Sequence, residues 1–284
     1  MSRISSGARI QKLRESIAMR TAVVRTKQCL FCTQPAGSAE HVVPEWLSKR
    51  MAIRDLGFQP GHYSESGGLT LRPQIKCEHF KTNQVCGDCN HGWMADLEAW
   101  AQRNFGPCVM PNIVLADLVR LQSIPGERDM IIRWLLKTAI IVERAFPMGP
   151  TAKVPASLYP VARGAQSPTD FWVSAGYIVE PNFDLHLVAG FRVWNGGVLQ
   201  PFQVHEESLS FAIQLNHLAM HLFRCPDATP TLKLATRLVD HDCPAVPVWL
   251  TEHMQFPERS LPAFPNFASF RDVLEVTARA PNAQ

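Results

Sequence analysis

The chain has 284 residues, of which 46% are hydrophobic and 19% are charged. This composition is typical of a globular protein and excludes a collagenous, low-complexity or intrinsically disordered chain. The length predicts roughly two domains, at about 150 residues each. No apolar run approaches the roughly 20 residues of a membrane-spanning helix, and the N-terminus lacks the apolar segment of a secretory signal, so we expect a cytoplasmic protein without a membrane partner.

Positive charge is concentrated at the N-terminus, where residues 1–28 hold seven Lys or Arg residues and one acid, Glu15. This segment carries a net charge of +6, and the remaining 256 residues carry −3. Apolar side chains at helical spacing over residues 7–20 predict a short amphipathic helix. Because a basic arm attracts phosphate groups, the segment predicts contact with DNA or RNA, with a solvated basic helix as the alternative.

Four of the eight cysteines form two Cys-x-x-Cys pairs, and 53 residues separate the pairs. They are Cys29, Cys32, Cys86 and Cys89. This spacing predicts a metal site rather than the disulfide framework of a secreted protein. Four thiolates would fill the tetrahedral shell of Zn²⁺, which makes zinc the expected ion and its role structural. Cys77 is a rival for one position, and we expect Cys108, Cys225 and Cys243 to be small core residues.

An acid and a histidine, Glu40 and His41, lie between the cysteine pairs in a segment that predicts a short strand ending at Pro44. A carboxylate is a hard ligand for Mg²⁺ or Mn²⁺, and an imidazole can take a proton from water near neutral pH. Neighbours on a strand point to opposite faces, so both side chains can serve one site only if the strand ends or bulges there. Asn90, which follows the second pair, would supply a second ligand oxygen, with His91 as the alternative ligand.

Four further segments are predicted to be helical from the spacing of their apolar residues. They cover residues 45–51, 92–103, 113–122 and 128–146. Residues 128–146 are apolar almost all round, which predicts a buried helix at the centre of a domain. Proline and glycine end this helix at residues 147–150, where we place a boundary, and a short strand is predicted over residues 68–72. We expect three tryptophans to pack in the core: Trp46, Trp93 and Trp100.

Beyond about residue 165 the apolar residues change from a helical to an alternating period, which predicts strands. These strands cover residues 171–179, 185–194 and 209–215, and residues 216–223 continue the alternation. Asn195-Gly196 predicts a hairpin turn, so we expect an antiparallel sheet packed on helices, with the tail after residue 247 wrapping the surface. His217 and His221 would meet one metal ion only if their segment were helical.

The motifs between the first and the second cysteine pair resemble those of the HNH endonuclease family, whose fold is also called ββα-metal. The resemblance is to a zinc-bearing branch and covers roughly residues 29–103. Its two halves are Glu40-His41-Val42-Val43-Pro44-Glu45-Trp46-Leu47 after the first pair, and Val85-Cys86-Gly87-Asp88-Cys89-Asn90-His91-Gly92-Trp93-Met94 around the second. The resemblance implies a metal ligand at Glu40, the general base at His41 and a second metal ligand at Asn90.

The resemblance implies a metal-dependent endonuclease that hydrolyses phosphodiester bonds in DNA, with RNA as the alternative substrate. Zinc would be its structural ion, and Mg²⁺ or Mn²⁺ its catalytic ion. A role in bacterial or phage defence is expected by analogy alone. The expected fold class is α+β, with four parts: a basic arm over residues 1–28, a zinc-bound ββα-metal domain over 29–106, a helical connector over 107–150 and a β-rich domain over 151–284. That last domain would serve target choice, oligomerisation or regulation.

Two features depart from the broader family. The acid before the histidine is Glu40 instead of the usual aspartate, and its side chain is one methylene longer. The middle asparagine of the family, which steadies the loop that carries the base, has no clear match. Asn83 is assigned to that position only weakly, because it lies closer to Cys86 than is usual.

Two alternatives remain open. The cysteines and the basic arm would also suit a non-catalytic zinc module that binds nucleic acid or a protein, in which Glu40 and His41 merely support the fold. In the other alternative the main activity lies in the C-terminal sheet domain, and a ligand bound there gates the nuclease.

Overall fold

The computed structural model describes the chain in eight segments. They are residues 27–63, 69–110, 128–146, 154–188, 207–224, 248–249, 263–266 and 268–269. Some predictions lie outside these described residues: the helices over 7–20 and 113–122, the boundary at 147–150, the turn at Asn195-Gly196, most of the tail after residue 247, and the positions of Cys225 and Cys243.

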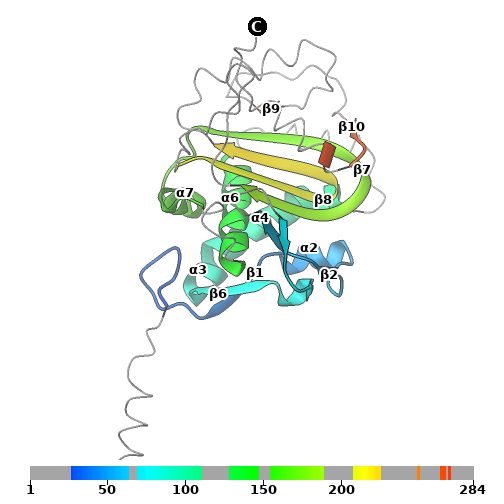
Figure 1. The fold of residues 1–284 in the computed structure, drawn as a ribbon. Coiled ribbons are helices and arrows are strands. Elements are labelled where there is room, and N and C mark those ends of the chain that lie inside the picture. The colour runs from blue at the N-terminus through cyan, green and yellow to red at the C-terminus, as the bar shows by residue number, and fades with distance from the viewer. Residues whose placement is uncertain are drawn as a thin grey trace, which may run out of the picture.

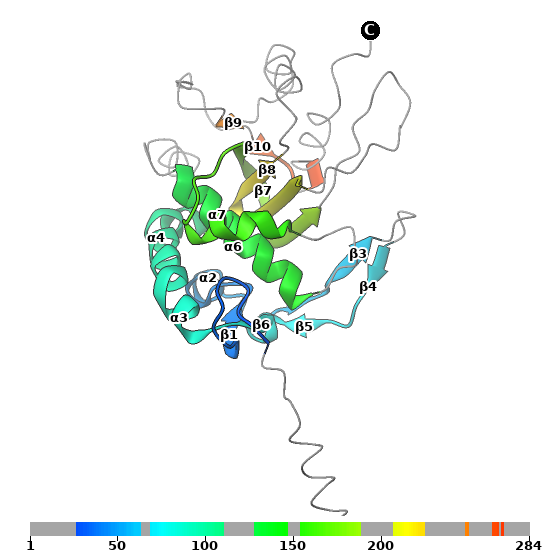
Figure 2. The ribbon, with the colours of Figure 1, turned by 90° about the vertical axis from the view of Figure 1, so that its left-hand side faces the viewer.

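Two antiparallel strands followed by a helical run form the first part of the fold. β1 (Ser38–His41) pairs with β6 (Lys81–Val85). The helical run then contains α3 (Gly87–Cys89), η2 (Asn90–Met94), α4 (Ala95–Phe105) and η3 (Gly106–Val109). The helix predicted over residues 92–103 is therefore confirmed as part of a longer run, and Figure 2 shows the start of this run beside β1.

The chain between β1 and β6 contains one short helix and two small antiparallel sheets. α2 (Glu45–Arg50) begins directly after Pro44, whose φ of −52° suits the entry to a helix. The sheets pair β2 (Gly57–Phe58) with β5 (Ile75–Lys76), and β3 (Gly61–Tyr63) with β4 (Leu69–Leu71), and η1 (Cys77–His79) then leads into β6. The helix predicted over residues 45–51 and the strand predicted over 68–72 are confirmed as α2 and β4.

The central element is α6 (Arg128–Ala145), in which 12 of 18 residues are buried. It packs against α4 and β6, and also against β7 and β8 of the C-terminal sheet. In Figure 1, α6 runs from this sheet down to β1 and β6. The buried helix predicted over residues 128–146 is confirmed, because apolar side chains nearly all round a helix require neighbours on every side.

Two short helices lie between α6 and the sheet: η6 (Ala156–Leu158) and α7 (Tyr159–Arg163). α7 ends at Gly164, which has a φ of +82°. Arg133 of α6 donates hydrogen bonds to two carbonyl groups at this end of α7, at 3.3 and 3.1 Å. Arg163 donates in turn to the Phe31 carbonyl at 3.2 Å, so α7 links α6 to the loop of the first cysteine pair.

The C-terminal sheet is built on a long antiparallel ribbon of β7 (Phe171–Val188) and β8 (Leu209–Arg224). Two short strands, β9 (Val248–Trp249) and β10 (Ala263–Phe264), also pair with β7. β9 is antiparallel to β7, as predicted for this sheet, whereas β10 is parallel to it.

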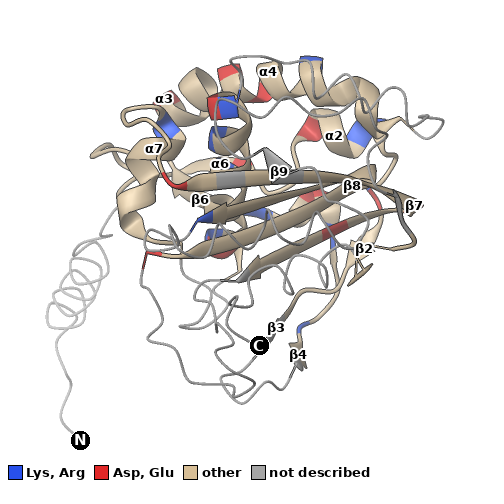
Figure 3. Ribbon diagram, turned by 90° about the horizontal axis from the view of Figure 1, so that it is seen from above, with Lys and Arg blue, Asp and Glu red and all other residues tan. Residues whose placement is uncertain are grey.

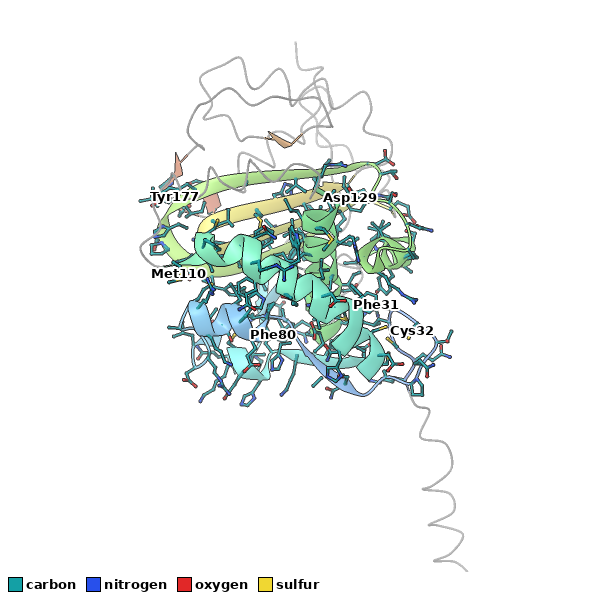
Figure 4. The ribbon with its side chains drawn as sticks, turned by 180° about the vertical axis from the view of Figure 1, so that it is seen from behind. Phe31, Cys32, Phe80, Met110, Asp129 and Tyr177 are labelled. Atoms are coloured by element: carbon teal, nitrogen blue, oxygen red, sulfur yellow. The ribbon has the colours of Figure 1, made fainter. Side chains whose placement is uncertain are left out.

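The ribbon is bent where the sequence predicts a gap between strands. Its register shifts between Tyr177 and Asn182 of β7, opposite Asn216 of β8, which has a φ of +59°. Tyr177 lies at the curved end of the ribbon in Figure 4. Residues 171–179 and 185–188 are strand, as predicted, but their separation into two strands is wrong, because the irregularity bends β7 without ending its pairing. Residues 189–194 of the second predicted strand lie outside the described residues.

The conformation of β8 also bears on whether His217 and His221 could bind one metal ion, which would require a helical segment. Residues 216–223 are strand, so the two imidazoles lack helical spacing. His217 Nδ1 lies 2.8 Å from the Ile178 carbonyl oxygen, and His221 Nε2 lies 2.7 Å from Ser210 Oγ. Within the described residues, neither histidine belongs to a group that could hold a metal ion.

One hydrophobic core runs through the described residues, from Cys29 and Phe31 through Trp134 of α6 to Leu215 of the sheet. The three tryptophans predicted to pack in the core do so, Trp100 buried and Trp46 and Trp93 partly buried against it. The described residues thus form an α+β fold. None of their helices combines the length and the apolar character needed to cross a membrane.

Candidate metal centre and adjoining polar site

Four cysteine sulfurs come together between the first loop and the start of the helical run. The Sγ atoms of Cys29, Cys32, Cys86 and Cys89 all lie within 4.8 Å of one another. Cys32 Sγ is 3.5 Å from Cys86 Sγ and 3.7 Å from Cys89 Sγ. A tetrahedral zinc ion with Zn–S bonds of about 2.3 Å holds its sulfurs roughly 3.8 Å apart. The cluster can therefore hold a metal ion, and its size and all-sulfur chemistry are compatible with zinc.

Short backbone contacts shape both loops around the sulfurs. The amide of Phe31 donates to Cys29 Sγ at 3.4 Å, and the amide of Cys89 donates to Cys86 Sγ at the same distance. The Leu30 amide donates to the carbonyl of Gln84 at 3.0 Å, which fixes the first loop to β6. Figure 4 shows Phe31 and Cys32 on this loop, beside the start of the helical run. Amide groups directed at sulfur stabilise thiolate, the form that binds metal.

The protein surroundings shift the pKa values of the cluster's thiols in different directions. Burial opposes ionisation of Cys29, but the amides of Phe31 and Cys86 and the neighbouring thiols together lower its pKa. Burial raises the pKa of Cys89 to about 12, and the Trp93 indole N–H opposes that rise. Without a cation, four thiolates at this spacing would repel one another, so a bound cation is what would let all four ionise.

Trp93 provides an independent indication that the cluster suits a cation. Its Nε1 is buried and has no hydrogen-bond partner within the part of the chain that the structure describes. The same indole lowers the pKa of the Cys89 thiol, against the larger opposing effect of burial. A buried N–H donor without an oxygen partner, near a thiol whose ionised form it favours, suits a metal-bound thiolate better than a neutral thiol.

The two further cysteines that the structure describes lie apart from the cluster. Cys77, the rival ligand, is buried at the start of η1, and burial raises its pKa to about 11. Cys108 is buried in the core, as predicted. Among the described residues, the cluster therefore consists of the four cysteines of the two Cys-x-x-Cys pairs.

Glu40 of β1 is directed into the protein interior. Its side chain is 12% exposed, and its Oε1 lies 2.5 Å from Nζ of Lys137, which is 1% exposed. Lys137 Nζ also lies 2.7 Å from Oε1 of Glu98 on α4. We name Glu40, Glu98 and Lys137 the ionic cluster. Burial alone would lower the pKa of Lys137, but the two carboxylates outweigh it and raise this pKa, so the ammonium group stays charged.

Sequence reasoning missed Glu98 and Lys137 as partners of Glu40. The available signal was a lysine in the middle of an otherwise apolar helix, because a buried lysine needs acidic partners. The sequence thus indicates that Lys137 has acidic partners, and the fold identifies them as Glu40 and Glu98.

His41 is half-buried at the last residue of β1, opposite Lys81 of β6. The pairing of β1 with β6 also shifts between Ser38 and Glu40. Of the two alternatives named from the sequence, the strand does end at the histidine, whereas the bulge lies before the acid. Glu40 faces α6, where it contacts Lys137.

Asn90 connects the metal centre to β1. Its Nδ2 donates to Ser38 Oγ at 2.7 Å and to the Ala39 carbonyl at 3.2 Å. Because a carbonyl oxygen only accepts hydrogen bonds, this contact fixes which end of the amide faces the strand. Oδ1 therefore faces elsewhere, as the atom that can act as a ligand. The helical path breaks beyond it at Gly92 (φ −94°, ψ −116°), which separates this turn from α4.

The two weaker assignments lie at the surface of the same region. His91, the alternative to Asn90, is exposed. Asn83 is exposed on β6, within the irregular part of the pairing with β1. By contrast, Asn90 makes hydrogen bonds that reach the strand carrying Glu40 and His41. Asn90 thus bonds this strand to the turn that follows Cys89.

α2 and α4 each carry charged residues of both signs, as Figure 3 shows, and α3 carries the acid Asp88. Neither sign dominates this side of the molecule. The +6 charge predicted to contact nucleic acid lies almost entirely within residues 1–26, outside the described residues.

No protein-family model matches the chain, and no curated protein and no solved structure matches it significantly.

Proposed function

We propose that the chain is a metal-dependent endonuclease of the HNH type, which hydrolyses phosphodiester bonds in DNA and holds a structural zinc ion on its four clustered cysteines. The observation that carries the proposal is the contact of Asn90 with Ser38 and Ala39. Through it, the turn that carries Cys89 is bonded directly to the strand that carries Glu40 and His41. The resemblance of the sequence motifs to that family gives the site its proposed chemistry.

In this proposal each residue has one task. The four cysteines hold the two loops together through zinc, which takes no part in the reaction because all its positions are filled. Glu40 and the Oδ1 atom of Asn90 would hold Mg²⁺ or Mn²⁺, which supplies stabilisation of the developing charge on the phosphate and the leaving oxygen. His41 would accept the proton of the attacking water.

The ion pair of Glu40 with Lys137 is compatible with this role. A carboxylate has two oxygens and about four lone-pair positions, and Lys137 engages Oε1. Oε2 is the atom that would serve as ligand. The half-buried position of His41 at a strand end supports its role as base, because water must reach the imidazole.

Nicking of supercoiled plasmid DNA in Mg²⁺ or Mn²⁺ tests the proposal. We expect the wild-type protein to nick, and His41→Ala to nick about 100-fold to 10,000-fold more slowly, the range for loss of a general base. His79→Ala is the matched control, because His79 is 66% exposed and belongs to η1. Equal zinc content and equal circular dichroism would show that all three proteins are folded.

Two results would contradict the proposal. One is a folded, zinc-loaded wild-type protein that cleaves neither DNA nor RNA in either metal. The other is His41→Ala nicking at the wild-type rate.

One observation favours a second candidate function, a non-catalytic zinc module that binds nucleic acid or a protein. Glu40 already has a buried cationic partner at 2.5 Å, as a purely structural acid would. This candidate predicts that the wild-type protein shifts DNA or RNA in a gel without cleaving it, and that His41→Ala shifts it equally well.

A further inference from the structure

The ionic cluster carries an uneven charge. It holds two carboxylates, of Glu40 and Glu98, and a single ammonium group, of Lys137. The ammonium group is almost completely buried, and the two acidic side chains are 12% and 17% exposed. Buried charges need hydrogen-bond or ion-pair partners. The number of such partners at each carboxylate therefore indicates the role of that acid.

Glu98 is the fully bonded acid of the cluster. Its Oε1 accepts from Lys137 Nζ at 2.7 Å and from Trp134 Nε1 at 3.1 Å. Its Oε2 accepts from Trp46 Nε1 at 2.8 Å. Three donors from α2 and α6 therefore hold both oxygens of Glu98, and Glu98 in turn fixes the position of the Lys137 ammonium group.

Glu40 is the less fully bonded acid. Within the described residues, the cluster engages its Oε1 through Lys137. The position of Lys137 therefore sets the orientation of the Glu40 carboxylate at the end of β1. Fixing one oxygen of a carboxylate also fixes the direction in which the other oxygen offers its lone pairs.

We propose that Lys137 and Glu98 are positioning residues, which hold the Glu40 carboxylate so that its Oε2 faces the divalent ion of the proposed active site. This inference rests on the proposed function and deepens it. Neither residue touches the ion or the substrate. Glu98 fixes the ammonium group of Lys137, and this ammonium group binds Oε1 of Glu40. The net negative charge of the cluster is then located at Glu40.

The positioning role can be separated from charge with a paired substitution. Lys137→Met combined with Glu98→Gln removes one positive and one negative charge, so the net charge of the cluster stays at −1. The glutamine oxygen can still accept an indole N–H, which limits the number of unpaired buried donors. Lys137→Arg keeps the ion pair and is the conservative variant. Glu78→Gln is the matched control, because Glu78 pairs with Arg54 at the surface, away from the ionic cluster.

Binding of Mn²⁺ to the full chain, followed through the electron paramagnetic resonance signal of the free ion, provides a readout that is independent of cleavage. We expect the paired variant to bind Mn²⁺ about 10-fold to 100-fold more weakly than wild type, the range for loss of a group that orients a metal ligand. Lys137→Arg should restore affinity to within a few-fold of wild type, and Glu78→Gln should not change it. The variants are compared at equal zinc content.

The outcomes separate this inference from the proposed function. If wild type binds no Mn²⁺, or if Glu40→Gln binds it equally well, the proposed divalent site is wrong. If wild type binds through Glu40 but the folded paired variant retains full affinity, the cluster is merely structural and the positioning role is wrong. Should the paired variant fail to fold, Lys137→Met with Glu98→Leu replaces the same charges by apolar side chains of similar size, and the same two results decide.

Discussion

At the scale of single residues, Trp93 combines a packed aromatic ring with a buried N–H donor. The ring packs edge-on against Phe31 with centroids 5.0 Å apart, which closes the apolar side of the first loop. Its buried N–H lowers the pKa of the Cys89 thiol. The packing and the hydrogen-bonding roles can be separated, because phenylalanine keeps an aromatic ring and lacks the donor.

Trp93→Phe should therefore lower the affinity for zinc while the protein stays folded. We expect a loss of about 10-fold in zinc affinity, at the lower end of the range for groups that support metal ligands. Competition with a chromogenic chelator measures it. Trp46→Phe is the control, because its N–H donates to Glu98 and lies outside the sulfur cluster. Equal zinc affinity in the Trp93 variant and wild type would contradict the role of this donor.

The residues that the sequence identifies are those with local signatures. Two Cys-x-x-Cys pairs predict a four-sulfur cluster, and the four sulfurs do come together. The ionic cluster was not predictable in this way, because Glu98 and Lys137 are 39 residues apart and meet only through the packing of α4 on α6. Glu40 was identified as an acid suited to metal, and its buried ammonium partner could be found only in the fold.

At the scale of elements, the β7–β8 ribbon shows why alternation predicts strands better than it predicts their ends. Glu180-Pro181-Asn182 resembles a turn, yet pairing resumes at Asn182, opposite Asn216. The left-handed conformation of Asn216 and the irregular register let the ribbon bend while it stays paired. Propensity identifies residues that can form a turn or a bend, and the strand pairing shows that a bend results.

His221 is buried on β8, where it makes the fold sensitive to acid. Burial, together with nearby His186, lowers the pKa of His221 to about 3, and Ser210 Oγ lies 2.7 Å from its ring. Unfolded histidine takes up a proton near pH 6.5, whereas folded His221 does so only near pH 3. The contribution of His221 to stability is therefore fully present above about pH 6.5 and is lost as the pH falls from 6.5 towards 3.

Urea unfolding at pH 7 and pH 5 checks this expectation. The free energy of unfolding should fall by about 1.4 kcal/mol more per pH unit below 6.5 in wild type than in His221→Gln, whose side chain does not titrate. An identical fall in both proteins would mean that the histidine is not held neutral in the fold.

At the scale of the whole molecule, α6 links the candidate site to the C-terminal sheet. It contacts α4 and β6 near the candidate site, and it carries β7 and β8 on the other part of its surface. The class α+β and the longer helices and strands followed from the periodicity of the apolar residues, whereas β6 and α7 were not predicted. The assembly of the elements around one core was not predictable either, because a helix that is apolar all round must have neighbours but its sequence does not identify them. The predicted domain limits at residues 106 and 150 remain predictions.

This arrangement makes the sulfur cluster the foundation of the candidate site. The cluster holds the turn that carries Asn90, and Asn90 bonds this turn to β1. β1 in turn places Glu40 against Lys137 of α6. Loss of one sulfur should therefore disturb the acid and the histidine together, even though neither touches the cysteines.

X-ray absorption at the zinc edge of the purified protein, with metal analysis of two cysteine variants, tests this foundation most directly. We expect one zinc ion per chain, bound by four sulfurs at about 2.3 Å. Cys86→Ser should lose the ion, and Cys77→Ser, which alters a buried thiol outside the cluster, should keep it. A protein without zinc, a shell containing nitrogen or oxygen, or full zinc content in Cys86→Ser would contradict the four-sulfur centre and the site built upon it.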